Sequence, residues 1–135
     1  GVAPQRLLQV GYGAMGSASV LMFAPLWPAG VLAALGPYLA VLVFSALGGL
    51  IPGTLFALAV RVSPGPATVS TTVGWMQQWS AFGQFAGPPL VAWVAAQVGG
   101  WQWTWAVLGC LSLLGLMLAQ QIARVLARRE AIRVG

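Results

Sequence analysis

The chain has 135 residues, of which 59% are hydrophobic and 5% are charged. Soluble domains carry about 25% charged residues, so this composition excludes a water-covered globular domain and predicts an integral membrane protein. The net charge of +5 comes from six arginines and one acid, Glu130. Because four of the arginines lie in residues 124–135, they favour an orienting role in a membrane over nucleic-acid binding.

Side chains for acid–base, nucleophilic and metal chemistry are scarce. The chain contains no histidine, and Glu130 is its only carboxylic side chain, so catalytic triads, paired carboxylates and metal-ligand clusters are not expected in it. The single Cys110 lies in an apolar run, where a small hydrophobic role is favoured over a redox role. We therefore expect no enzyme activity, no catalytic residue, no metal and no cofactor.

The first predicted membrane span covers residues 7–25 and is rich in glycine, alanine and serine. Small side chains let helix backbones approach closely in a bilayer, so packing is favoured over a functional role for its serines. Residues 26–36 are predicted to form a short turn at the membrane surface, with Trp27 and Tyr38 as interfacial anchors. The small face of the first span contains Gly11, Ala14, Ser17 and Ala18.

The second predicted span covers residues 38–60 and contains a G-x-x-x-G pair, Gly49 and Gly53. Pro52 lies in mid-span, where it releases the carbonyl four residues earlier and predicts a kink. Interrupted helices often line transport pathways, so Thr54 beside the kink is a candidate for the substrate path. The alternative is a proline kink that contacts no ligand.

The third predicted span, residues 68–97, contains the most unusual stretch of the chain. On a helix, its aromatic side chains fall on one arc, and amides and small residues fall on the opposite arc. An unpartnered amide is costly in a bilayer, so the polar arc is predicted to face protein or a water-filled path. Its substrate-path candidates are Gln77, Ser80 and Gln84, for which interhelical hydrogen bonds are the alternative role. The aromatic arc contains Trp75, Trp79, Phe82 and Trp93.

A second G-x-x-x-G pair, Gly83 and Gly87, lies in the same span and is a candidate for helix packing. Pro88 and Pro89 follow it directly and are predicted to interrupt the hydrogen-bond ladder. A span of thirty residues is longer than a bilayer needs, so it is expected to tilt, to kink at the prolines or to extend past the surface.

The fourth predicted span covers residues 101–123 and opens with three tryptophans, which favour an interfacial belt over a binding cage. Its body is expected to face lipid, and residues 124–135 are expected to form a basic amphipathic tail on the membrane surface. With four spans, all six arginines fall on one side of the membrane. The positive-inside rule then places both termini in the cytoplasm.

Residues 48–95 resemble the C-terminal half of major facilitator superfamily transporters; their sequence is GGLIPGTLFALAVRVSPGPATVSTTVGWMQQWSAFGQFAGPPLVAWVA. Within that superfamily, the residue pattern is similar to that of bacterial cyanate and nitroimidazole-type members. The resemblance implies an all-α membrane protein whose four spans are helices nine to twelve of a twelve-helix transporter. The expected partners are the N-terminal helices of that transporter, a lipid bilayer and a small-molecule substrate. The resemblance also places Thr54 near the substrate path, and Gln77, Ser80 and Gln84 toward the cavity or the other half.

Two functions remain open from the sequence. The first is part of a secondary active transporter that moves a small organic solute across the bacterial inner membrane by alternating access. No acid or histidine lies within a predicted span, so proton coupling would need a titratable group elsewhere. The second is a self-contained four-helix assembly subunit that uses its G-x-x-x-G faces to bind partner helices.

Overall fold

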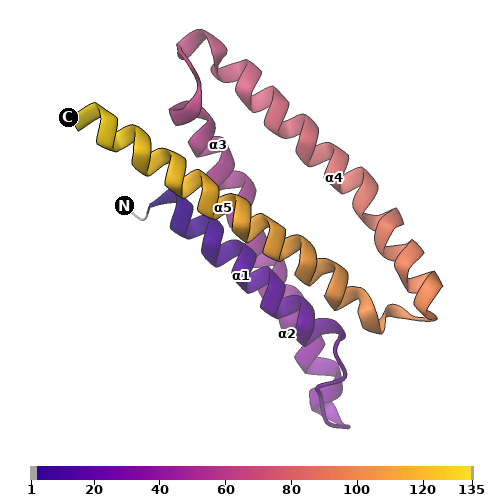
Figure 1. Cartoon of the computed structure of the whole chain (residues 1–135). Coiled ribbons are helices and arrows are strands. Elements are labelled where there is room, and N and C mark those ends of the chain that lie inside the picture. The colour runs from indigo at the N-terminus through magenta and orange to yellow at the C-terminus, as the bar shows by residue number, and fades with distance from the viewer. Residues whose placement is uncertain (1–2, 135) are drawn as a thin grey trace.

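The computed structural model describes residues 3–134, apart from the side chains of residues 130, 133 and 134, and within this range it is helical with no strand. Successive long segments run in alternating directions: down α1, back through α2 and α3, down α4 and back along α5 (Figure 1). The start of α1 and the end of α5 therefore lie at the same end of the molecule. The long helices are α1 (Pro4–Phe23), α2 (Val31–Gly48), α3 (Leu50–Val62), α4 (Val69–Val98) and α5 (Thr104–Val134), and the short 3-10 turns are η1 (Pro66–Thr68) and η2 (Trp101–Trp103).

The connection between α1 and α2 is shorter than the sequence predicts. The turn expected over residues 26–36 is wrong for residues 31–36, because α2 begins at Val31, directly after Gly30 with its positive φ of 102°. Gly36 and Pro37 do not break the helix. Gly36 is instead a packing residue, since a Cβ atom at this position would overlap the indole of Trp27.

Trp27 joins the end of α1 to α2. Its indole lies over Gly36, and its Nε1 donates a hydrogen bond of 2.7 Å to the carbonyl of Leu21. Replacing Trp27 with phenylalanine keeps an aromatic ring but removes this donor, so the free energy of unfolding is expected to fall by about 1 kcal/mol. Denaturation of the purified protein in detergent measures the loss. Trp93→Phe, at an exposed position of α4, is the control that is expected to change little.

A one-residue interruption lies near Pro52, where the sequence predicts a kink, and Gly49 at this point keeps a right-handed helical backbone. The helix breaks at Gly49, between α2 and α3, and Pro52 lies in the first turn of α3, where its missing N–H has no intrahelical partner to lose. Gly49 N donates to the carbonyl of Ser45 at 3.2 Å, which closes the last turn of α2.

Helix α4 is continuous over thirty residues, so Pro88 and Pro89 interrupt its hydrogen-bond ladder without ending the helix. Each proline removes its own backbone donor, but the turns on both sides stay helical. The helix ends instead at Gly99, which has a φ of 74° and caps it in the left-handed conformation.

Helix α5 is also continuous, and the basic tail expected on the membrane surface is its straight extension. Residues 116–134 contain no glycine or proline, so nothing in the sequence ends the helix near residue 123. The last eleven residues therefore continue along the axis of α5.

The packed core lies where α1 meets α3 and α5. Leu8, Leu58 and Ala119, one from each of these helices, form its buried centre. Small residues bring α1 and α5 together in antiparallel register: a Cβ at Gly115 would overlap the ring of Tyr12, and a Cβ at Gly16 would lie 3.3 Å from the Cβ of Ser112. One face of α5 packs against α1, so the expectation that the body of this helix faces lipid can apply only to its exposed faces.

Two segments are long and apolar enough to cross a membrane: Val31–Val62, which joins α2 and α3, and Trp101–Arg129. The sequence predicts four spans, and the regions of α1 and α4 do not reach the same hydropathy. The two apolar segments are mostly exposed, with 11% and 17% of their most apolar windows buried. The core of a soluble protein buries its apolar helices, so these segments have the character of membrane helices.

Candidate functional site

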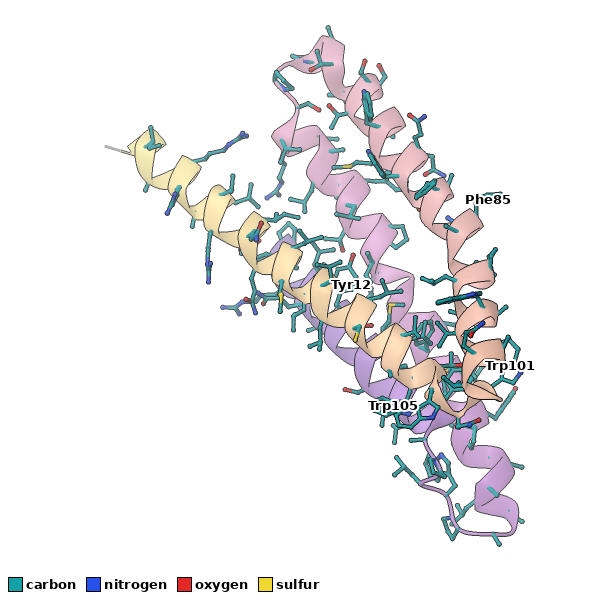
Figure 2. All side chains as sticks on the ribbon, turned by 45° about the vertical axis from the view of Figure 1, so that its right-hand side comes forward. Tyr12, Phe85, Trp101 and Trp105 are labelled. Atoms are coloured by element: carbon teal, nitrogen blue, oxygen red, sulfur yellow. The ribbon has the colours of Figure 1, made fainter. Side chains whose placement is uncertain are left out.

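Helix α4 stands apart from the other helices along most of its length (Figure 1). It meets α3 and α5 near its two ends, and Ala95 is its one buried residue. Its aromatic side chains are exposed, and Figure 2 shows Phe85 on the side turned away from the other helices. Trp101 and Trp105 lie at the end where the chain turns from α4 into α5. The separation leaves one face of α4 toward the core and the other without a partner.

A cleft of about 870 Å³ lies between α4 and the α1–α3 side of the packed core. Its core-side wall is apolar and includes the break between α2 and α3. Its α4 wall mixes aromatic, thioether and polar side chains. The core side contributes Tyr12, Met15, Gly48, Ile51, Pro52, Leu55 and Phe56, and α4 contributes Thr72, Trp75, Met76, Trp79, Ser80 and Gln84.

The polar side chains of the α4 wall are Thr72, Ser80 and Gln84, of which Ser80 and Gln84 form a neutral pair one helical turn apart. Gln84 Nε2 donates a hydrogen bond of 3.2 Å to Ser80 Oγ. The amide and the hydroxyl each have donor and acceptor groups, so the pair can bind a polar group of a ligand without a formal charge. None of the lining residues is charged. The cleft therefore suits a mostly apolar ligand with a hydrogen-bonding group.

The structure brings together some of the predicted site residues and separates others. Ser80, Gln84 and Pro52 line the cleft, whereas Thr54 and Gln77 do not. Thr54 is buried, and its hydroxyl donates to the carbonyl of Leu50 at 2.6 Å within its own helix. The cleft thus meets α4 along the boundary between the two predicted arcs, which places tryptophans beside Ser80 and Gln84.

The two G-x-x-x-G pairs do not pack against other helices in the described part of the chain. A Cβ at Gly53, Gly83 or Gly87 would meet nothing within 4 Å, and Pro88 is exposed beside them. Gly49 belongs to the break between α2 and α3. These faces are available to helices outside the chain or to lipid.

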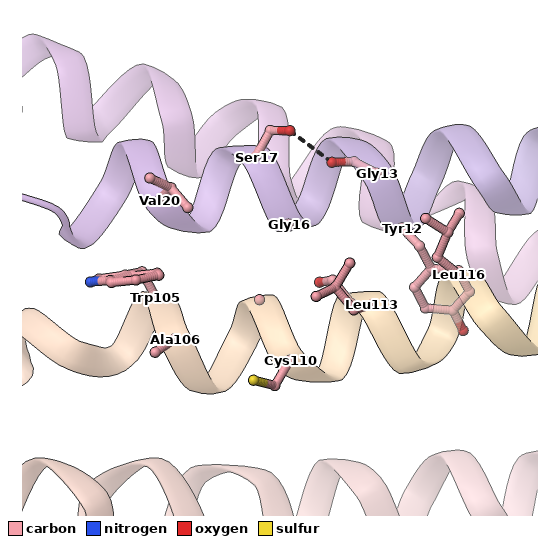
Figure 3. Close-up of a pocket in the computed structure, with 12 residues that line it drawn as sticks. Tyr12, Gly13, Gly16, Ser17, Val20, Trp105, Ala106, Cys110, Leu113 and Leu116 are labelled. Atoms are coloured by element: carbon pink, nitrogen blue, oxygen red, sulfur yellow. Dashed lines mark hydrogen bonds between the residues drawn. The ribbon is translucent and has the colours of Figure 1, made fainter.

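A smaller cavity of about 420 Å³ lies between α1 and α5 (Figure 3). Its walls are mostly apolar, and the hydroxyl of Ser17 donates to the carbonyl of Gly13 at 3.0 Å within α1. Cys110 and Trp105 line it from α5. Ser112 and Tyr12 add two further hydroxyl groups to this lining, and none of the lining residues is charged.

Sequence reasoning missed the aromatic and thioether side chains of the core-side wall. Tyr12 lines both cavities and packs over Gly115, and its sequence signal is an aromatic ring between two glycines, Gly11 and Gly13. Phe56 and Met15 carry no comparable signal, because apolar residues in an apolar helix do not mark a face.

The described side chains contain no group of three potential metal ligands. Comparison with protein-family models, with curated proteins and with solved structures found no match to this chain. The function is therefore argued from the cleft itself and from the placement of the helices around it.

Proposed function

We propose that this chain is part of a secondary active transporter that moves a small organic solute across the cytoplasmic membrane by alternating access. The observation that carries the proposal is the cleft beside α4, whose uncharged and mostly apolar lining includes a neutral polar pair, Ser80 and Gln84. Transporter sites of this kind lie between helices near the middle of the bilayer, where polar side chains face a cavity.

The spacing of aromatic and basic residues along α5 supports the membrane location. A rise of about 1.5 Å per residue puts Arg124 about 29 Å from Trp105 along this continuous helix. The hydrocarbon core of a bilayer is about 30 Å thick, with tryptophans at its interfaces and arginines on the cytoplasmic side. Arg6 and Arg61 lie at the ends of helices on the arginine side of this arrangement. We infer four spans with both termini in the cytoplasm, and the alternating directions of the helices support this topology.

The isolation of α4 supports an alternating-access mechanism. This helix is held mainly near its ends, so it can move against the packed core without breaking that core. If the chain is the last part of a major facilitator transporter, as its sequence resembles, α4 is the helix that meets the other half. Its open glycines, Gly83 and Gly87, lie on the same arc of the helix as Ser80, so helices of that half would contact α4 at the cleft.

An assembly subunit without transport activity is the second candidate. The open faces at Gly53 and at Gly83 favour it, because small-residue faces without a neighbour are typical of helices that bind other helices. In that case a partner helix fills the cleft, and Gln84 hydrogen-bonds to protein instead of to water or solute.

Cysteine labelling in native membranes tests the proposal without knowledge of the substrate. In a full-length protein whose cysteines, Cys110 among them, are replaced by alanine, Gln84→Cys or Phe85→Cys supplies the one reactive thiol. A charged, membrane-impermeant maleimide reacts with the thiolate, which forms in water and is suppressed in apolar surroundings. Gln84→Cys is therefore expected to react at least about tenfold faster than its neighbour Phe85→Cys.

Labelling of Gln84→Cys from both faces of the membrane is the expected result for an alternating pathway. Equal, slow labelling at the two positions would show that no water reaches the cleft and would favour the assembly subunit. Phe85→Cys is the matched control because it lies one residue away on the same helix and is 80% exposed on the side turned away from the cleft.

A further inference from the structure

The basic end of α5 has a geometry that points to a second, lipid partner. We propose that Arg124, Arg128 and Arg129 form a binding surface for the headgroups of anionic phospholipids. The inference rests on the membrane location proposed above but not on transport. It begins from the continuity of α5, which runs as one helix from Thr104 to Val134.

The end of α5 projects beyond the helix that packs against it. Tyr12 faces Gly115 and Gly16 faces Ser112, so the two helices are antiparallel. In this register, Pro4 at the start of α1 lies beside about residue 124 of α5. The last turns of α5 are therefore free of α1, and the side chains of Arg124, Arg128 and Arg129 are exposed.

The three arginines lie within a narrow range of depth near the membrane surface. With Arg124 about 29 Å from Trp105, the first guanidinium lies at the edge of the hydrocarbon. Arg128 and Arg129 lie only about 6 and 7.5 Å further along the axis. Long arginine side chains bend along a helix toward the interface, so all three can reach the phosphate layer.

The chemistry of these side chains fits a phosphate ligand in that layer. A guanidinium group makes two parallel hydrogen bonds to phosphate oxygens and keeps its charge at all physiological pH values. Arg124 and Arg128 are one turn apart and share a face, and Arg129 lies about 100° around the helix. The surface therefore contacts headgroups on two sides of α5. Glu130 is the only acidic side chain in the chain, so it can neutralise at most one of these arginines.

Lipid selectivity measured by electron spin resonance tests the proposal. The full-length protein is placed in phosphatidylcholine bilayers that contain either spin-labelled phosphatidylglycerol or spin-labelled phosphatidylcholine. We expect the motionally restricted fraction to favour phosphatidylglycerol by about threefold at low salt and to lose this preference at about 1 M salt. Equal association of the two lipids at low salt would overturn the proposal.

Matched variants assign the preference to these residues. The triple change Arg124→Gln, Arg128→Gln and Arg129→Gln is expected to abolish it, and the corresponding triple lysine variant to retain most of it. Arg133→Gln removes one positive charge at a helix position about 13.5 Å beyond Arg124 along the axis, past the phosphate layer, and is expected to have little effect. Persistence of the full preference in the triple glutamine variant would overturn the proposal.

Two further results show whether a failure would lie in the lipid-binding inference or in the membrane location on which it rests. If neither labelled lipid is motionally restricted by the protein, the membrane location is wrong and the inference fails with it. If inorganic phosphate removes the preference more effectively than chloride at equal ionic strength, the arginines bind a free anion, and the lipid assignment is wrong. We expect phosphate and chloride to act alike, because the lipid is held in the bilayer next to the arginines at high local concentration.

Discussion

Replacing Gly115 with alanine is expected to lower the free energy of unfolding by about 2 kcal/mol, as is typical of an overpacked core. The added Cβ would overlap the ring of Tyr12, so the ring must leave its site or α1 and α5 must separate. These two helices form the most extensive contact in the molecule. Equilibrium unfolding in mixed detergent micelles measures the loss.

Gly109→Ala is the matched control, because it lies on the same helix and its Cβ would meet nothing within 4 Å. Alanine favours a helix over glycine by about 1 kcal/mol, so this control is expected to be neutral or stabilising. Tyr12→Ala in the Gly115→Ala background should recover part of the loss, since it removes the overlapping ring. Equal stability of the two single variants would show that the two helices are not packed at Gly115.

The sequence predicts the helices well where periodicity and glycine caps decide the outcome. The break near Pro52, the turn at Gly99 and the length of α4 follow from local chemistry. The start of α2 could not be predicted, because Gly36 has a packing role that depends on Trp27, nine positions earlier. A glycine that accommodates a distant ring and a glycine that ends a helix look the same in a sequence.

The candidate site was predicted in part for a similar reason. Helical periodicity places Gln77 and Gln84 within about 20° of each other, because they are seven residues apart, so it gives no reason for one and not the other to line the cleft. The structure puts Gln84 at the cleft and Gln77 outside it. The contact between α1 and α5 was missed because Ser112, Gly115 and Ala119 lie among leucines, and only their spacing of three and four residues marks a packing face.

The buried centre and the polar pair of the candidate site are located in different helices. The buried centre consists of residues from α1, α3 and α5, and α4 contributes no member to it. An element with few buried contacts opens at low cost in free energy. The cleft therefore lies between a fixed wall and a wall that can move, which is the arrangement that alternating access needs.

The contrast between Leu8→Ala and Trp79→Ala tests this division. Leu8 is 1% exposed and packs against Leu58 and Ala119, so its truncation leaves a cavity that neighbouring helices cannot fill. Lipid is as apolar as leucine, so the cost in a bilayer is mainly that of the cavity, and we expect a loss of about 2 kcal/mol. Trp79 is 67% exposed on α4, and its replacement is expected to change the free energy of unfolding by less than about 0.5 kcal/mol.

Unfolding of both variants under the same mixed-micelle conditions measures the difference. Leu21→Ala, an exposed leucine on the same helix as Leu8, controls for the loss of side-chain volume alone. A large loss for Trp79→Ala would mean that α4 is packed against the core in the folded protein, and the cleft would then be closed. A small loss for Trp79→Ala with a large loss for Leu8→Ala would mean that α4 can move without unfolding the other helices, because the interactions that hold them together lie elsewhere.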